Sequence, residues 1–417
     1  MARLMTYKEA YSLMNQIVKQ ATGQTELAVI DSSSFVSAGE TVLATGTENT
    51  LNALSIVMGR TLMAVRPYQA KLMILQAINT AMFTSRLRKV SFYSQDAKAT
   101  GWLNTDENPK NLYDKYTNDT NPAGGNVGSM WEQQKPAVLE MNFGGSSTWD
   151  FQVTIYEEQL RAAFRSESEF IALVNGIMTQ KANDIEYTKE QFNRMNLLNY
   201  IAGVYDMSTL MPGSVVNLTA EYNTKYGTSY TSEQLRTTYL ESFLKFFVAR
   251  FKLASDYMEE RTALYHWSPE KVVDGVTYNK ILRHTPKSAQ RCFLYQPLFT
   301  EATANVLPTI FNPQYLAVEN YEPVTFWQNQ QNRALISVTP AIPDPATGSQ
   351  KAGAEVDNLF VVGVLFDKDA IMTDFQFESA NSTPIEARKK YRNVWYHNVK
   401  NAINDFTENG IIFIMKD

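Results

Sequence analysis

The chain has 417 residues, of which 44% are hydrophobic and 19% charged, enough apolar material for two or three domains or for one large core. Its 38 basic and 43 acidic side chains leave a net charge of -5. No basic excess is present to neutralise phosphates, so the composition argues against sequence-specific nucleic-acid binding.

Cysteine content and hydropathy bear on the compartment. The single cysteine, Cys292, cannot form an intramolecular disulfide, which is compatible with a reducing compartment. Residues 1–20 interleave charged and apolar residues and lack the apolar core of a secretory signal peptide. No window approaches the roughly eighteen apolar residues of a membrane helix. We expect a chain that is cytoplasmic when it is made.

The N-terminal region is predicted to be an arm. From Tyr7 to Gln20 the apolar residues have the spacing of one helical face. Residues from Glu26 to Glu48 are rich in Ser, Thr and Gly and predict a loose segment, and a short helix is predicted from Asn49 to Gly59. Two helices around a loose segment indicate an extended arm.

A long hairpin is predicted next. The stretch RLRKVSFYSQ alternates as a strand, and strand patterns return in PAVLEMNF and TWDFQVTIY. Between them, residues 96–135 are polar and rich in Gly, Asn and Pro, and cannot form a core. Because unstructured loops of this length are uncommon inside compact domains, the pattern predicts a projecting hairpin with a variable tip.

One long helix is predicted from about Glu157 to Gly203. Apolar residues recur at seven-residue spacing, and Val174 and Met195 fill the intermediate positions: Phe164, Ile171, Met178, Ile185 and Phe192. The pattern predicts that Ile185, at the centre, faces an apolar core, and that a kink lies near Gly176.

After this helix the sequence predicts mixed structure and then strands. The stretch from Thr231 to Trp267 is amphipathic, with Thr231 or Ser232 as its cap, and QRCFLYQPLF predicts a strand. Residues 339–358 predict an exposed loop. The remaining strands are predicted at Val324–Trp327, Leu335–Val338, Leu359–Phe366, Ile371–Phe377, Tyr391–Val399 and Ile411–Met415.

The usual marks of catalysis, metal binding and cofactor binding are missing from the sequence. The three histidines, His266, His284 and His397, are widely separated, and no HExxH or CxxC pair occurs. Cys292 lies in an apolar strand-like run, which is typical of a buried, unreactive thiol. The glycines of FGGSS precede a strand and not a helix, so they cannot present helix amides to a phosphate. We predict no catalytic, metal or cofactor residues and no cofactor.

Asp367 and Asp369 are the remaining candidates for chemistry. Lys368 lies between them and offsets part of the field that would raise a carboxyl pKa. The pattern favours a solvated polar turn where one strand ends and the next begins. The alternative is an acid/base or metal site.

The order of elements and two stretches resemble the major capsid protein of tailed bacteriophages, the Johnson or Hong Kong phage fold, and most closely that of small podophages with a terminal protein. The first stretch, YEEQLRAAFRSESEFIALVNGIMTQKANDIEYTKEQFNRMNLLNY, resembles the family's spine helix. The second, LFVVGVLFDKDAIMTDFQFESANSTPIEARKKYRNVWYHNVKNAINDFTENGIIFIMKD, is similar to the family's C-terminal block. The likeness is one of overall order, because no single motif is diagnostic.

The resemblance implies an α+β fold with six parts. These are an N-terminal arm (1–70), an extended loop (71–155), the spine helix of a peripheral domain (156–205), an axial domain (206–367), a long peripheral β-hairpin (368–407) and a terminal strand that returns to the axial domain (408–417). Asp367 to Asp369 would then mark the crossing between the two domains.

The resemblance also implies a function. The chain would be a non-enzymatic major capsid protein that assembles with itself into hexamers and pentamers of an icosahedral or prolate shell. The shell would be assembled in the bacterial cytoplasm and would become the virion capsid. It would contact packaged double-stranded DNA without sequence specificity, and it would contact no membrane. Scaffolding, portal and decoration proteins are further partners that the resemblance allows. The alternatives are an encapsulin-type compartment shell, or a carboxylate-dependent hydrolase that uses Asp367 and Asp369.

Overall fold

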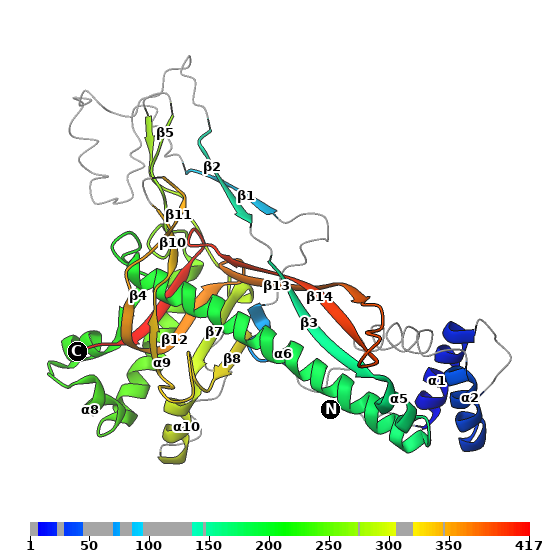
Figure 1. Cartoon of the computed structure of the whole chain (residues 1–417). Helices are drawn as coiled ribbons and strands as arrows, with labels where there is room; N and C mark the ends of the chain where they lie inside the picture. Colours follow the sequence, from blue (N-terminus) through cyan, green and yellow to red (C-terminus); the bar gives the residue numbers. More distant parts are fainter. Residues whose placement is uncertain are drawn as a thin grey trace, which may run out of the picture.

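A single long helix connects the parts of the molecule (Figure 1). The computed structural model describes residues 7–22, 29–44, 70–75, 86–94, 136–144, 147–273, 276–305, 320–344 and 347–417. Helix α6 runs past a small sheet to a larger sheet with its covering helices, a pair of helices lies near the other end of α6, and a narrow hairpin projects from the body. The fold is α+β, as expected. No described helix has both the length and the apolar composition needed to cross a bilayer.

The two N-terminal helices form a packed pair. Helix α1 (Tyr7–Thr22) confirms the first predicted helix. The prediction of a loose segment from Glu26 to Glu48 is wrong, because helix α2 (Ser32–Ala44) occupies most of it. Asp31 precedes α2 and its carboxylate accepts a bond from the Ser34 amide at 2.7 Å, while Phe35 is buried against the neighbouring helices. The helix predicted from Asn49 to Gly59 lies outside the described residues.

The arms of the projecting hairpin are confirmed. Strands β1 (Arg86–Phe92) and β2 (Val138–Gly144) pair antiparallel over seven residues each. The polar insertion at 96–135 lies outside the described residues. The third predicted strand, β3 (Ser147–Tyr156), leaves this hairpin and pairs with β14 instead.

The predicted long helix is interrupted once, near its start. Helix α5 (Glu157–Ala163) ends and α6 (Glu167–Asp206) begins after Ser166, whose hydroxyl accepts a bond from the Glu169 amide at 3.2 Å. Helix α6 then continues without a break through Gly176, so the interruption lies about ten residues before the predicted kink.

The seven-residue stripe does not mark the buried face along the whole of α6. Phe164, Val174 and Phe192 are buried, but Ile185 is only half-buried and Met195 is 57% exposed. The buried face in the middle of α6 includes the side chains of Glu186 and Glu190, so an apolar stripe alone does not mark it.

The middle of α6 buries polar side chains and holds a strap of chain, residues 70–75, that includes the short helix η1 (Met73–Leu75). The Glu186 carboxylate accepts a bond from the Ala70 amide at 3.1 Å. Glu322 accepts one from the Leu72 amide at 2.6 Å, where the backbone has a positive φ of 61°. Apolar periodicity could not predict this contact, because carboxylates make it.

The region after α6 has short strands, four α-helices and one short 3-10 helix among the described residues. They are β4 (Val215–Asn217), α7 (Leu218–Tyr226), α8 (Ser232–Arg236), α9 (Leu240–Glu259), β5 (Lys271–Val273), β6 (Val276–Tyr278), η3 (Lys287–Ala289), β7 (Gln290–Tyr295) and α10 (Gln296–Asn305). Thr231, one of the two residues predicted as the cap, is the N-cap of α8 and forms a capping box with Gln234. The amphipathic stretch is divided between α8 and α9.

The larger sheet has six strands in the order β4-β15-β12-β7-β8, with β9 paired to β12. Strand β12 (Val356–Asp367) is central and almost entirely buried, and β15 (Gly410–Met415) lies antiparallel beside it. β9 (Leu335–Val338) matches its prediction, but β8 (Asn320–Val324) ends where the strand Val324–Trp327 was predicted to begin. The loop predicted at 339–358 contains the small hairpin of β10 (Ala341–Pro343) and β11 (Gln350–Ala352).

The smaller sheet has the order β13-β14-β3. Strands β13 (Ile371–Ser382) and β14 (Tyr391–Asn404) form the long hairpin that the resemblance implied. The chain thus leaves the larger sheet at Asp367, the end of β12, and returns to it at β15.

Two positions on α6 test the observed burial. Ile201 is fully buried in the larger core, whereas Met195 is 57% exposed on the same helix. We expect Ile201→Asp to lower the free energy of unfolding by several kcal/mol, because it buries an unpaired charge. Met195→Asp should change it by less than about 1 kcal/mol, the usual range for an exposed helical site. Urea denaturation of the unassembled chain measures both, and equal losses would show that this register of α6 is wrong.

Candidate functional site

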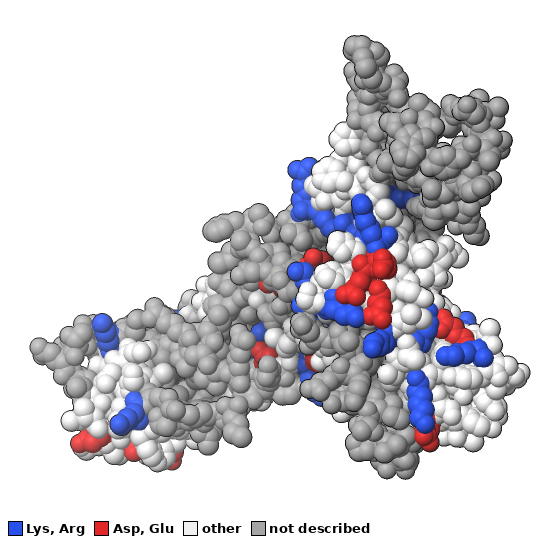
Figure 2. Space-filling view, turned by 180° about the vertical axis from the view of Figure 1, so that it is seen from behind, with Lys and Arg blue, Asp and Glu red and all other residues white. Residues whose placement is uncertain are grey.

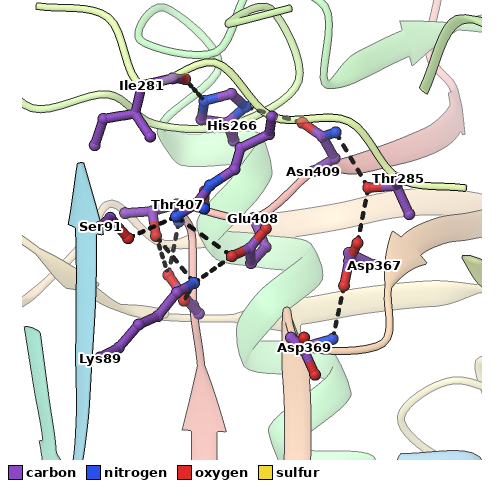
Figure 3. Close-up of polar contacts among 12 residues, drawn as sticks. Lys89, Ser91, His266, Ile281, Thr285, Asp367, Asp369, Thr407, Glu408 and Asn409 are labelled. Atoms are coloured by element: carbon purple, nitrogen blue, oxygen red, sulfur yellow. Dashed lines mark hydrogen bonds and ion pairs between the residues drawn. The ribbon is translucent and has the colours of Figure 1, made fainter. Parts of the chain in front are cut away.

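The polar junction between the two sheets is the candidate site (Figure 3). We define it by β1, residues 281–285, the turn from β12 into β13 and the turn from β14 into β15. These elements bring together side chains that are more than 300 residues apart, as in the contacts of Lys89 with Asp405 and Glu408. Charged side chains of both signs also gather in the middle of the face seen in Figure 2.

The Asp-Lys-Asp triplet lies at a turn, but it is not fully solvated as predicted. Lys368 and Asp369 are exposed, whereas Asp367 is only 7% exposed. One oxygen of Asp367 accepts a bond from the Thr285 hydroxyl at 2.8 Å and the other accepts one from the Asp369 amide at 2.9 Å. The turn is confirmed. The burial of Asp367 was missed because Thr285 lies 82 residues away.

Asp367 contacts Asp369 through the backbone amide of Asp369, at 2.9 Å. Burial raises the pKa of Asp367, and the bonds from the Asp369 amide and from Thr285 oppose this rise. Among the described residues no group of three or more His, Cys, Asp and Glu side chains could hold a metal ion. The described residues thus offer no metal site for the hydrolase alternative.

A charged cluster attaches the hairpin to the junction. The Lys89 ammonium, on β1, forms ion pairs with Asp405 and Glu408 in the turn before β15. Arg283 lies 3.4 Å from the Glu408 carboxylate and donates to the Ser91 hydroxyl of β1 at 2.6 Å. Burial raises the pKa of Glu408, while the charges of Lys89 and Arg283 oppose that rise. The base of the hairpin is thus held by charged groups from elsewhere in the chain.

The other sequence candidates lie in different places. His266 is fully buried in the junction and contacts Asn409 and the Ile281 carbonyl. His284 is exposed, and His397 pairs with Asp150 at 2.6 Å on the smaller sheet. Cys292 is buried in β7, and burial raises the pKa of its thiol well above the ordinary value. The described structure does not gather the three histidines into one site.

The lysine at position 89 should stabilise the junction. The side chain of Asp405 is 1% exposed and that of Glu408 is 12% exposed, so Lys89→Met leaves two poorly solvated carboxylates without the positive charge of the Lys89 ammonium. We expect a loss of about 3 kcal/mol in the free energy of unfolding.

The neighbouring Arg88 provides the matched control. It pairs with Glu140, and the two side chains are 65% and 44% exposed. Arg88→Met should therefore cost less than about 0.5 kcal/mol. Urea denaturation of the unassembled chain at one pH compares the two variants. Similar losses in the free energy of unfolding would mean that Lys89 contributes no more to stability than Arg88.

Comparisons with known proteins give a family match and several distant structural neighbours. A family model described as Phi29-like phage major capsid protein matches residues 112–414. No curated protein sequence matches the chain.

Three solved structures are among the neighbours. A capsid structure of Staphylococcus phage Andhra is 11% identical, with a TM-score of 0.48, and covers 84% of this chain and 85% of that one. The capsid of cyanophage P-SCSP1u is 12% identical, with a TM-score of 0.42 and coverage of 82% and 87%. The mature capsid of bacteriophage PhiM1 is 9% identical, with a TM-score of 0.42 and coverage of 84% and 88%.

Proposed function

This chain belongs to the family of Phi29-like phage major capsid proteins, and we propose that its copies join as hexamers and pentamers into a closed shell around double-stranded DNA. Membership makes it a structural protein of the virion capsid that assembles with itself. The match over residues 112–414 is the observation on which the proposal rests.

The finer assignments are part of the same proposal. The six parts implied by the resemblance remain the division we propose, with the crossing from axial to peripheral domain at Asp367. Assembly takes place in the host cytoplasm, contacts with DNA are non-specific, and a scaffolding protein, a portal and decoration proteins join the shell. The chain has no catalytic role.

The outer face of the hairpin supports contact between copies. Side chains of β1 alternate: Lys89 and Ser91 point into the junction, and Val90 and Phe92 point away from it. Val90 is 44% and Phe92 65% exposed. Apolar side chains on a narrow, projecting hairpin cannot be covered by its own two strands, so a neighbouring copy is the surface that would cover them.

This face gives a test of the proposal. We expect Val90→Asp with Phe92→Asp to leave the melting midpoint of the unassembled chain nearly unchanged, because both side chains are exposed. Assembly should fail, since two carboxylates would have to be buried between copies. Electron microscopy and melting curves of the same preparation measure both effects.

A conservative variant serves as the control. Val90→Thr with Phe92→Tyr keeps the size of the side chains and the strand propensity, so shells should form. Normal shells from the aspartate variant would contradict an inter-subunit role for this face. Absence of shells from the unsubstituted protein, alone and with a scaffolding protein, would contradict the proposed assembly itself.

A further inference from the structure

Four buried side chains form a continuous line of hydrogen bonds across the junction (Figure 3). His266 Nδ1 lies 2.9 Å from Asn409 Oδ1, and Asn409 Nδ2 lies 3.2 Å from Thr285 Oγ1. The Thr285 hydroxyl then reaches Asp367 Oδ2 at 2.8 Å. His266, Thr285 and Asn409 are 0% exposed and Asp367 is 7% exposed. Water therefore has little access to these groups, and each depends on its neighbour for a partner.

The far end of the line fixes one proton. His266 Nε2 faces the Ile281 carbonyl, which can only accept, so Nε2 must be protonated. If the ring is neutral, Nδ1 is an acceptor and the Asn409 amide must turn its NH2 group toward it. The Asn409 oxygen then accepts from Thr285, and the Thr285 oxygen needs a donor. Only a protonated Asp367 can supply it.

The same proton can be placed at the other end. If His266 is protonated on both nitrogens, Nδ1 donates to the Asn409 oxygen, the amide donates to Thr285, and Thr285 donates to an ionised Asp367. Both arrangements satisfy every contact and contain the same number of protons. With neutral His266 and ionised Asp367, one proton is missing and one contact must pair two acceptors. An unmatched buried contact of this kind is destabilising.

The surroundings decide which arrangement is favoured. Charged and titratable groups around the line come from every adjoining element: Lys89 on β1, Arg283 beside Thr285, Lys368 and Asp369 in the β12–β13 turn, Tyr200 on α6, and Asp405 and Glu408 before β15. Lys89 and Arg283 are paired with Asp405 and Glu408, and the charge of Lys89 only partly offsets the effect of burial on the pKa of Asp367. Burial lowers the pKa of His266 and raises that of Asp367. Both effects favour the uncharged arrangement, with the proton on Asp367.

We propose that His266, Asn409, Thr285 and Asp367 share one proton. This proton stabilises the turns at which the chain passes between the two sheets, and we call the protonated line the lock. The lock lies where β12 passes into β13 and β14 into β15, the same place at which Lys89 and Arg283 hold the hairpin. Loss of the proton at higher pH loosens that joint. The inference goes beyond the proposed function and does not depend on it.

The sign of the pH dependence follows from the carboxyl group. The pKa of an unfolded Asp is about 3.9, and a higher pKa in the folded chain means that the folded state retains its proton to a higher pH. The contribution of the lock is complete below the unfolded value and is lost as pH rises through the folded value. Stability from this group therefore falls with increasing pH.

Asp367→Asn is the decisive variant, because an asparagine side chain mimics the protonated acid. Its NH2 group can donate to Thr285 and its oxygen can accept from the Asp369 amide, so the line is complete with neutral His266 at every pH. The melting midpoint of the unassembled full-length chain is measured from pH 4 to pH 8. We expect equal midpoints for the variant and the unsubstituted chain at the acid end, and a higher midpoint for the variant as pH rises.

Asp369→Asn is the matched control, since it removes the same charge two residues away at an exposed position. It should show the same pH dependence as the unsubstituted chain. Three results would overturn the proposal. The midpoints of Asp367→Asn and the unsubstituted chain could differ by the same amount at every pH, or Asp367→Asn could fail to fold. The third is a difference in midpoint that widens with pH in Asp369→Asn as well.

The imidazole gives a second readout. Nitrogen NMR of the histidines, with the His266 signal assigned by its absence in His266→Gln, should show a neutral ring protonated at Nε2 throughout the range in which the midpoints diverge. An imidazolium at His266 that loses its proton in that range would place the titration on the ring and contradict the assignment to Asp367.

Discussion

Helix α6 is the constraint on which the rest of the structure depends, because it takes part in both of the large hydrophobic cores. Its first turns, with Phe170 and Val174, pack with α1, α2 and the smaller sheet. Its last turns, with Leu197 and Ile201, pack against the larger sheet. The two cores are separate clusters of buried residues. A helix of 40 residues therefore connects the two cores.

Between the two cores α6 makes directional contacts. Asn193 accepts a bond from the Thr373 hydroxyl at 2.8 Å, and Asn196 donates to the Met372 carbonyl at 3.1 Å. Glu186 holds the strap at Ala70 in the same way. Hydrogen bonds of this kind contribute less net stability than apolar burial, but they require one alignment and penalise others. The middle of the helix thus fixes how β13 and the strap lie along it.

The junction extends this arrangement to the hairpin. Lys89 and Ser91 face inward and are tied to the turn before β15 and to Arg283, so the opposite side of β1 must face outward. A subunit of a shell needs projecting elements at a defined angle, because copies that meet at variable angles cannot close. Charges that anchor the base of the hairpin, and apolar side chains that leave it exposed, are consistent with that requirement.

Local patterns in the sequence determined a large part of this protein. Alternation and continuous apolar runs located β1, β2, β9, β12, β14 and β15, and the 3.6-residue spacing located α1, because these elements bury regular faces. The seven-residue apolar repeat located most of α6, although it did not mark its buried face throughout. The strands β13 and β14 and the turn at Asp367 followed from the same patterns, whereas the pairing of these strands in a long hairpin was implied by the resemblance to tailed-phage capsid proteins. The sequence missed α2, since Ser and Gly obscured the short stripe that includes Phe35.

Only the tertiary structure decided which polar residues matter. Asp367 was predicted to be a solvated turn residue, because its contact with Thr285 is made across 82 residues of sequence. Nothing in the sequence around Lys89 indicated its carboxylate partners, which lie more than 300 residues away. The polar face of α6 at Glu186 was likewise hidden, because apolar periodicity carries no information about the polar partners of a helix. Secondary structure depends on neighbours within a few residues, whereas a buried charge is defined by partners that folding alone brings together.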